Sequence, residues 1–388
     1  MTLFSPDTPI DDMPDWAAWL RLHMTPMLGP QTMRRLLQSW GSAQAVLSQT
    51  MLGLQSHLNE TQAQALQTAP PDWLSTCERI QRWLDQASST VQHAVWTWGD
   101  PAYPAGLLAL DDPPPLVFVQ GQLQWPCLNS LAIVGSRNPT PQGRENARAL
   151  AHSLHMAGCC VVSGLALGID GAAHQGALQS AMQSTTSTSC ATVAVVGTGL
   201  DQVYPRAHQA LARDVAQHGW VLSELPPGTP PMAHHFPRRN RLIAGLSAGV
   251  LVVEAAMKSG SLITADLALS QGKEVFAVPG SIHSPLSRGC HALLRQGAKL
   301  VETAQDVLEE LTWTLQAPLA DATDQAPVTL SADAVAVLAA LGHDPQPLDM
   351  LLLRSGLALA PTLAALHDLQ HREQVASMPG GFFQRVKA

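Results

Sequence analysis

The sequence has few charged side chains and no long uninterrupted apolar run. Lys, Arg, Asp and Glu make up 13% of its 388 residues, and 46% of the residues are hydrophobic. This balance is typical of a globular chain with a substantial core and excludes the disordered class. A run of about 18 uncharged apolar residues is absent, which argues against a membrane-spanning helix. The acidic N-terminal segment lacks the basic and apolar regions of a secretory signal, so we expect a cytoplasmic protein.

Cysteine pairs with metal-ligand spacing are also missing. Six cysteines are present, none in a C-x-x-C pattern, and a cytosolic chain usually keeps such thiols reduced. The adjacent His234 and His235 are poorly placed to converge on one ion. We therefore expect reduced thiols, no metal site and no cofactor. The cysteines are at positions 77, 127, 159, 160, 190 and 290.

The net charge of −8 is unevenly distributed along the chain. Residues 226–300 contain eight lysines and arginines and three acids, which gives this stretch a charge of +5 and leaves −13 for the rest. Within it, HHFPRRNR places three arginines in four positions. The sequence therefore predicts a basic face on an acidic protein.

Composition divides the chain into four stretches. Residues 14–68 predict short helices, and the turn at Gly29-Pro30 fits either a hairpin that offers N–H groups to a DNA phosphate or a plain helical hairpin. Residues 98–123 are too proline-rich for a helix, but PLVFVQG predicts a short strand at a domain edge. The expected division is an N-terminal helical domain at 1–90, a core domain at 91–315, a linker at 316–329 and a small domain at 330–388.

The core domain alternates apolar strands with glycine-containing turns and helices. Nearly all-apolar strands are typical of a parallel sheet that is covered on both faces. The alternation predicts an α/β, Rossmann-like, doubly wound and mostly parallel sheet. SAMQSTTSTSC at 180–190 predicts an exposed loop. The expected strands are 131–135, 159–163, 192–197, 220–224, 249–254 and 274–278, and the expected helices are 143–157, 171–183, 206–218 and 261–271.

The C-terminal stretch predicts a winged helix. Two helical runs are followed by a hairpin around Gly380 and Gly381. The helix that would enter DNA, ALAPTLAALHDLQ, is nearly uncharged, so contact with protein or packing fits it at least as well as DNA binding.

Three expected strands end in turns suited to anions. These turns are GSRNPTPQG, SGLALGIDGAAH and VVGTGLDQVYP, and each opens a helix whose first N–H groups are unpaired. A G-x-G-x-x-G fingerprint is absent after the first strand, which argues against NAD. In its place Ser136 and Arg137 supply a hydroxyl and a guanidinium suited to phosphate.

The stretch FPRRNR and the segment after the next strand complete the candidate site. Phe236 can stack on an unpaired base, while arginine and Asn240 can contact phosphates or base edges. Lys258-Ser259-Gly260-Ser261 lies before a helix and forms a second anion nest.

Candidate catalytic groups are few. Asp170 occupies an expected N-cap position and His174 lies one turn later, so structural roles are favoured over acid–base chemistry. Glu254 fits either a general base or, as we favour, a partner for an arginine of the 238–241 cluster. A Ser/His/Asp or Cys/His set is absent, and we expect a protein that is not an enzyme.

Together these motifs resemble the DprA/Smf family of DNA-processing proteins. Six long motifs occur in order across about 98–305; the N-terminal helices look like the family's SAM- or helix-hairpin-helix-like domain, and 330–388 is similar to its winged helix. The resemblance implies a homodimer that binds and protects single-stranded DNA and loads RecA recombinase onto it during natural transformation. Asp266, near the anion nest, departs from a purely basic surface. The implied DNA contacts are Ser136, Arg137, Ser163, Gly164, Gly168, Phe236, Arg238, Asn240, Arg241, Lys258, Ser259, Gly260 and Ser261.

Two other functions fit parts of the pattern. The fold resembles nucleoside-monophosphate phosphoribohydrolases, in which Arg137 and Glu254 would act together. Those enzymes carry P-G-G-x-G-T-x-x-E, whereas this chain has KSGSLITA with no matching Glu. A nucleotide-sensing regulator that binds duplex DNA through its winged helix is the third possibility, and the lack of cations on the tail helix weakens it.

Overall fold

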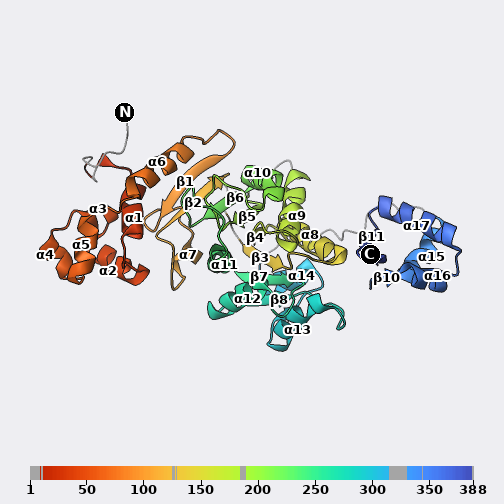
Figure 1. Cartoon of the computed structure of the whole chain (residues 1–388). Helices are drawn as coiled ribbons and strands as arrows, with labels where there is room; N and C mark the ends of the chain where they lie inside the picture. The colour runs from red at the N-terminus through yellow and green to blue at the C-terminus, as the bar shows by residue number, and fades with distance from the viewer. Residues whose placement is uncertain are drawn as a thin grey trace.

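A nine-stranded sheet forms the centre of the structure (Figure 1). Its strand order is β1-β2-β6-β5-β4-β3-β7-β8-β9; β1, β2 and β6 pair antiparallel, and all pairs from β6 to β9 are parallel. The computed structural model describes residues 9, 12–124, 127, 129–183, 189–313, 330–342 and 344–386. The strands are β1 Gln92–Thr97, β2 Leu116–Gly121, β3 Ser130–Gly135, β4 Cys160–Ser163, β5 Thr192–Val195, β6 Trp220–Ser223, β7 Gly249–Val253, β8 Glu274–Ala277 and β9 Lys299–Leu300.

Helices cover both faces of the sheet, as the all-apolar strands require. Along β3, Leu131 and Ile133 pack with α8, α9 and α14, whereas Ala132 and Val134 pack with α11, α12 and α13. The alternation follows from the two-residue repeat of a strand, and the Rossmann-like fold predicted from the sequence is confirmed. The helices of this region are α7 Ala105–Leu108, α8 Pro141–Met156, α9 Ile169–Gln183, α10 Gln209–His218, α11 His235–Leu246, α12 Gly260–Ser270, α13 Arg288–Arg295 and α14 Ala304–Glu310.

Helix α11 was not among the helices expected from the sequence. Its first turns contain Pro237 and three arginines, which hide the apolar period that Leu242 and Ile243 provide later. Proline is tolerated there because the first turn of a helix needs no intrahelical N–H bond. The arginine cluster therefore lies on a helix, where successive side chains point in different directions.

The strand order reverses beside β3, and this reversal positions the site. The chain moves outward from β3 through β4 and β5 to β6, then crosses back to place β7 on the other side of β3. At such a point the connections leave the two strands in opposite directions and open a crevice beyond their carboxyl ends. Here that crevice lies beyond Gly135 of β3 and Val253 of β7.

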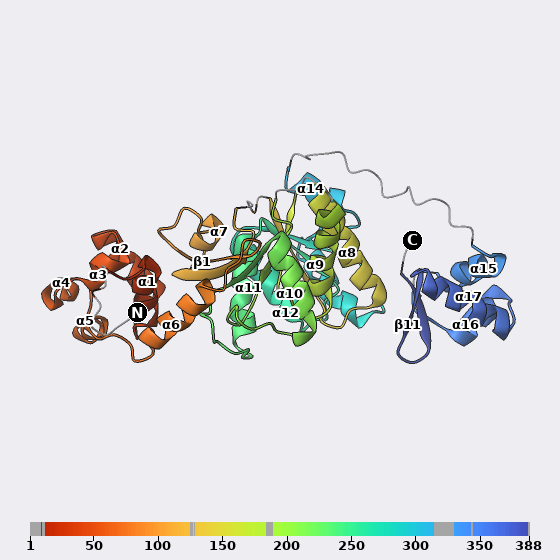
Figure 2. The ribbon, with the colours of Figure 1, turned by 90° about the horizontal axis from the view of Figure 1, so that it is seen from above.

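The N-terminal helices pack against the antiparallel edge of the sheet. Their core, including Trp19, Leu36 and Ile80, is continuous with Phe118 of β2 and Val215 of α10. Figures 1 and 2 show these helices at the β1 end of the molecule. They are α1 Asp15–Met24, α2 Pro30–Trp40, α3 Ala43–Leu47, α4 Met51–Gln55, α5 Glu60–Gln67 and α6 Trp73–Leu84.

The C-terminal elements form a winged helix with its own small core. The long helical run expected after residue 347 is split, because Gly356 adopts a left-handed φ of 68° that ends the first of two helices. The expected linker at 316–329 and residues 184–188 of the expected loop lie outside the described residues; 180–183 belong to α9. The elements are α15 Ala332–Leu341, β10 Gln346–Pro347, α16 Leu348–Ser355, α17 Leu359–His371, β11 Val375–Met378 and β12 Phe382–Arg385.

Among the described residues, no single helix is long and apolar enough to cross a membrane. Helices α16 and α17 together pass a test of length and composition, but the chain bends by 109° between them.

Candidate nucleic-acid interface

A pocket of about 740 Å³ occupies the crevice beyond β3 and β7. Its walls come from the turn after β3, the N-terminal turns of α11, and the segment from Ala256 to the start of α12. Eight of the residues expected from the sequence line it, so the fold brings together segments more than 100 residues apart. They are Ser136, Arg137, Phe236, Asn240, Lys258, Ser259, Gly260 and Ser261.

Exposed cations and a helix N-terminus make the pocket suitable for an anion. The side chains of Arg137 and Lys258 are exposed, and both line the opening. Ser259 caps α12 by accepting a hydrogen bond from the Ser261 N–H, and the positive end of the α12 dipole points to the same place. A phosphate in the pocket would therefore meet two cations and a capped helix end.

Two aromatic rings flank these cations. The Tyr204 and Phe236 rings lie with their centroids 5.3 Å apart, and the Arg137 guanidinium lies 5.9 Å from the centre of the Phe236 ring. Tyr204 is 48% exposed although it is aromatic. Sequence reasoning missed it as a site residue; its signal was the aromatic residue in the turn motif VVGTGLDQVYP. Exposed rings beside cations can stack on unpaired bases while their backbone phosphates are bound.

Arg239 supports the pocket from beneath. The side chain is buried, and its Nη1 donates hydrogen bonds to the carbonyls of Gly164, at 2.5 Å, and Val195. A Cβ at position 164 would collide with this guanidinium, so only glycine fits there. Burial lowers the pKa of Arg239 to about 10, and the group remains protonated at neutral pH. Arg239 therefore ties α11 to the ends of β4 and β5.

The other two arginines of the cluster face a carboxylate that the sequence did not single out. Arg241 pairs with Glu224 and donates to the Asp112 carbonyl at 2.6 Å, while the Arg238 Nε lies 3.3 Å from Glu224. Burial raises the pKa of Glu224, and the two guanidiniums oppose that rise. Neither arginine lines the pocket; the Arg238 side chain is 52% exposed and that of Arg241 only 12%.

Glu254 is not the partner of these arginines, so that expectation is wrong. Its carboxylate accepts hydrogen bonds from the Thr140 N–H at 2.8 Å and from the Thr140 hydroxyl at 2.5 Å. Thr140 is the N-cap of α8, so Glu254 adds negative charge at the start of that helix. It faces a different hollow from Arg137, and the structure does not assemble the Arg/Glu pair of a phosphoribohydrolase.

The expected contacts Ser163, Gly164 and Gly168 lie behind the pocket lining, to which only Ala166 of their turn contributes. The Ser163 hydroxyl is fully buried and donates to the Ile133 carbonyl at 2.6 Å. Gly168 has a φ of +84°, and a Cβ there would strike the backbone of Ser136 and Arg137. Together with Gly164, these residues shape the turn after β4, and Gly168 lets it pack closely against the turn that carries Arg137.

The expected N-cap role of Asp170 is also wrong. Helix α9 begins at Ile169, and the buried Asp170 carboxylate accepts the N–H groups of Gly164 and Ala166 at 3.1 and 3.3 Å. It therefore holds the turn that precedes the helix. Asp170 therefore has a structural role, as expected, but it binds the N–H groups of the preceding turn and does not cap the helix.

Asn240 belongs to the pocket, whereas Asp266 does not. Asn240 donates to the Gly260 carbonyl at 3.3 Å and accepts from the Arg239 Nε at 3.2 Å, so it joins the two walls of the pocket. Asp266 lies one and a half turns into α12, is exposed, and does not line the pocket.

A sequence profile described as DNA recombination-mediator protein A matches residues 94–312. Profiles of the DprA-like N-terminal HHH domain and the DprA winged helix domain match residues 14–50 and 321–381. Protein Smf of Escherichia coli is 38% identical over 383 residues, which is 97% of each chain.

The chain belongs to the DprA/Smf family.

Family members match in structure as well as sequence. DNA processing protein DprA of Streptococcus pneumoniae is 46% identical over 211 residues, 54% of this chain and 72% of that protein. Its X-ray structure superposes with a TM-score of 0.63 and covers 76% of this chain and 99% of that one. A Helicobacter pylori DprA structure, described for its single-stranded DNA binding mode, is 30% identical, covers 57% of this chain and 96% of that one, and gives a TM-score of 0.49.

His174, the second residue considered for acid–base chemistry, is fully buried and structural. Its Nδ1 lies 2.7 Å from the Thr192 hydroxyl, which itself donates to the Val161 carbonyl. The hydroxyl proton is therefore already used, so Nδ1 must carry the imidazole hydrogen and Nε2 is left without a partner. Protonating Nε2 would create a buried cation without an acceptor, and burial lowers the pKa of His174 to about 3.

This burial predicts loss of stability in mild acid. Below about pH 6.5 the unfolded chain protonates His174 while the folded chain does not, so stability falls as the pH drops towards 3. His174 lowers the free energy of unfolding by up to about 1.4 kcal/mol for each pH unit of acidification. Urea unfolding between pH 5 and 7.5 should show a shallower slope for His174→Gln. The exposed His283→Gln should keep the wild-type slope; equal slopes for all three proteins would contradict the assignment.

Proposed function

We propose that the pocket beyond β3 and β7 binds single-stranded DNA. The observation that carries this proposal is the placement of exposed Arg137 and Lys258 beside the Tyr204 and Phe236 rings at the capped end of α12. Cations for the backbone together with aromatic faces for the bases are what sequence-tolerant single-strand binding requires. The bases of a duplex are stacked inside the helix and cannot reach rings set within a pocket.

The chemistry of the pocket supports binding without turnover. Glu254 is occupied at the start of α8, and the buried Asp170 holds backbone N–H groups. Asp170 lines the same pocket as Arg137, but its carboxylate is already engaged and is not placed to act as an acid or base on a nucleotide. The engagement of both carboxylates counts against a phosphoribohydrolase, within the part of the chain that the structure describes.

Loading of RecA recombinase onto the bound strand is the second part of the proposal. It is supported by membership of a family described as a DNA recombination mediator. A mediator must hold the strand without covering the bases that the recombinase needs. An open pocket that grips a few nucleotides and leaves the rest of the strand uncovered satisfies this requirement better than a channel that encloses the strand.

Homodimerisation is the third part, and α12 offers a surface for it. Ile263 and Leu269 are 44% and 49% exposed on this helix, and Met257 just before it is 55% exposed. A twofold contact along α12 would bring two pockets close together, because the start of α12 lines the pocket. Two linked pockets would raise the avidity for a long strand.

This surface gives a direct test. Leu269→Glu would place two like charges in a twofold contact, so we expect it to convert the dimer into a monomer at micromolar concentration. Size-exclusion chromatography with light scattering reports the mass. Leu353→Glu makes the same change at a 77% exposed leucine on α16 and should leave the mass unchanged. A dimer that survives Leu269→Glu would place the contact elsewhere.

The function itself is tested with labelled oligo-dT and a matching duplex. Fluorescence anisotropy across a salt series should show tighter binding to the single strand, with affinity that falls as salt rises. Incubation with AMP should release no ribose phosphate. Duplex preference would support a regulator that uses the winged helix, and AMP hydrolysis would move the function to the nucleotide enzymes.

A further inference from the structure

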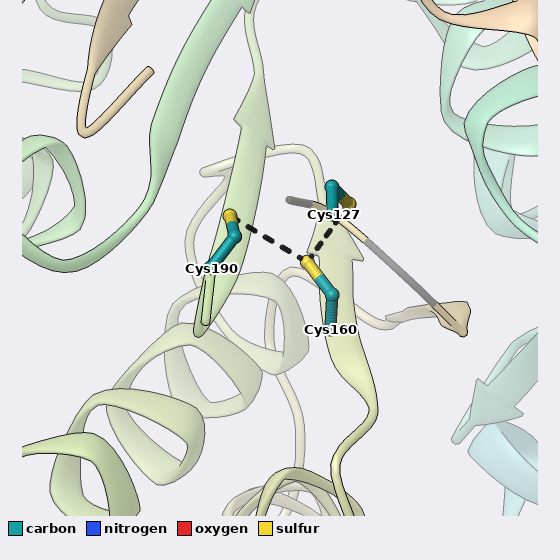
Figure 3. A group of neighbouring side chains, drawn as sticks. All are labelled: Cys127, Cys160 and Cys190. Carbon is teal, nitrogen blue, oxygen red and sulfur yellow. Dashed lines mark hydrogen bonds between the residues drawn. The ribbon is translucent and has the colours of Figure 1, made fainter. Parts of the chain in front are cut away.

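Three cysteine sulfurs converge at the amino ends of central strands of the sheet, at the opposite end of these strands from the pocket. The Cys127 and Cys160 sulfurs lie 3.1 Å apart, the Cys160 and Cys190 sulfurs 3.8 Å apart, and all three lie within 4.8 Å of one another. Figure 3 shows the Cys160 sulfur between the other two. Half of the cysteines in the chain therefore meet at one point, which the spacing in the sequence did not reveal.

The fold assembles this cluster from three separate segments. Cys127 precedes β3, Cys160 is the first residue of β4, and Cys190 precedes β5, so parallel neighbours bring the three positions together. Cys159 is next in the chain to Cys160 but belongs to the core on the other face of the sheet. It contributes nothing to the cluster and serves as a matched control.

The spacing suits one ion shared by three sulfurs. A thiolate–metal bond of about 2.3 Å places sulfurs about 4 Å apart around a common centre. The observed separations require shifts of less than 1 Å to reach that geometry. Cys160 and Cys190 are buried and Cys127 is half-buried, so one side of the cluster opens towards solvent.

The third sulfur separates this arrangement from a simple disulfide pair. A Cys127–Cys160 disulfide would use two sulfurs and leave out the Cys190 sulfur, which lies 3.8 Å from that of Cys160. Soft thiolates select d¹⁰ cations such as Zn(II) and Cu(I) over Mg(II) or Ca(II). Cu(I) accepts three sulfurs alone, while Zn(II) would add a water on the open side.

We propose that Cys127, Cys160 and Cys190 form a binding site for one thiophilic d¹⁰ cation. The bound ion joins Cys127, before β3, to the starts of β4 and β5. It therefore stabilises the amino ends of these strands, at the opposite end from the DNA pocket. The site is independent of the proposed function, because the two lie at opposite ends of the same strands.

The test uses the full-length reduced protein. Zn(II) alone is added in one arm, and Cu(I) alone is added against a chromogenic chelator in the other; metal per chain is then measured by mass spectrometry. We expect one ion per chain in at least one arm, and which arm identifies the metal. Cys127→Ser, Cys160→Ser and Cys190→Ser should each lower the affinity at least tenfold, whereas Cys159→Ser should not.

A spectroscopic readout keeps the test valid if a buried variant fails to fold. Co(II) added to the wild type should give near-ultraviolet thiolate charge-transfer bands that are lost in Cys127→Ser, the variant at the half-buried position. Oligo-dT binding by Cys127→Ser should stay at the wild-type level, which separates failure here from failure of the DNA proposal. The proposal would be overturned if Cys159→Ser and all three cluster variants had equal metal content. It would also be overturned if protein alkylated at lysis contained a Cys127–Cys160 disulfide.

Discussion

Replacing Arg137 and Lys258 together by alanine is expected to weaken binding to oligo-dT by roughly 100-fold at low salt. Each exposed cation lost from a phosphate contact costs about 1.4 kcal/mol, or tenfold. Two fewer phosphate contacts should also reduce the slope of log affinity against log salt by about 1.4, given about 0.7 for each contact on a single strand. Anisotropy measured across a salt series gives both values.

The matched control removes two exposed arginines that do not line the pocket. Arg82 on α6 and Arg295 on α13 are both exposed, so Arg82→Ala/Arg295→Ala changes the net charge equally. It should alter the affinity less than threefold. If both double variants weaken binding equally, the effect comes from net charge and the pocket is not the DNA site. Arg241 is unsuitable for this test because its loss would leave the buried Glu224 carboxylate without its ion-pair partner.

Replacing Arg239 by alanine is expected to lower the free energy of unfolding by about 3–5 kcal/mol, measured by urea unfolding. The change would leave the carbonyls of Gly164 and Val195 without their donor and would remove the positive charge that lowers the pKa of the buried Asp170 carboxyl against the effect of burial. Removing a buried cation in this way costs about this much, since unpaired polar atoms and an uncompensated charge stay in a dry interior. Most domains have only about 5–15 kcal/mol in total.

Arg238→Ala is the control for this prediction. It lies next in the chain but is half-exposed, so its loss should cost no more than about 1 kcal/mol. Arg239→Leu combined with Asp170→Asn should be less destabilising than the sum of the two single changes, because neither charge is then left alone. Loss of less than 1 kcal/mol in Arg239→Ala would show that the guanidinium does not support the turn.

The sheet could be predicted from the sequence because its signal is local. Each strand from β3 to β8 is a short apolar run bounded by glycine or polar residues, and the expected bounds agree with the structure to within two residues. The turns after the strands were also visible, since glycine followed by Ser136 and Arg137 marks a strand end.

The partners of charged side chains could not be predicted in the same way. Arg238, Arg239 and Arg241 are almost adjacent in the chain, but α11 turns Arg239 into the interior and both Arg238 and Arg241 towards Glu224. Which carboxylate meets which arginine depends on how β6 and β7 are ordered in the sheet. Sequence spacing carries no information about that order, so Glu254 was assigned where Glu224 belongs.

The three cysteines illustrate the same limit. Their separations of about 30 residues match no metal motif, because the spacing reflects the length of a strand, helix and turn rather than a ligand loop. Only the parallel alignment of β3, β4 and β5 reveals that three strand starts share one place.

The exposed cations of the pocket also determine how a polyanion can approach. The chain as a whole carries −8, whereas exposed Arg137 and Lys258 and the N-terminus of α12 meet at the pocket. If the pocket binds DNA as proposed, local attraction there opposes the repulsion from the net negative charge of the molecule, and collisions are oriented before contact. The rate of capture should then decline as added salt shortens the reach of both fields.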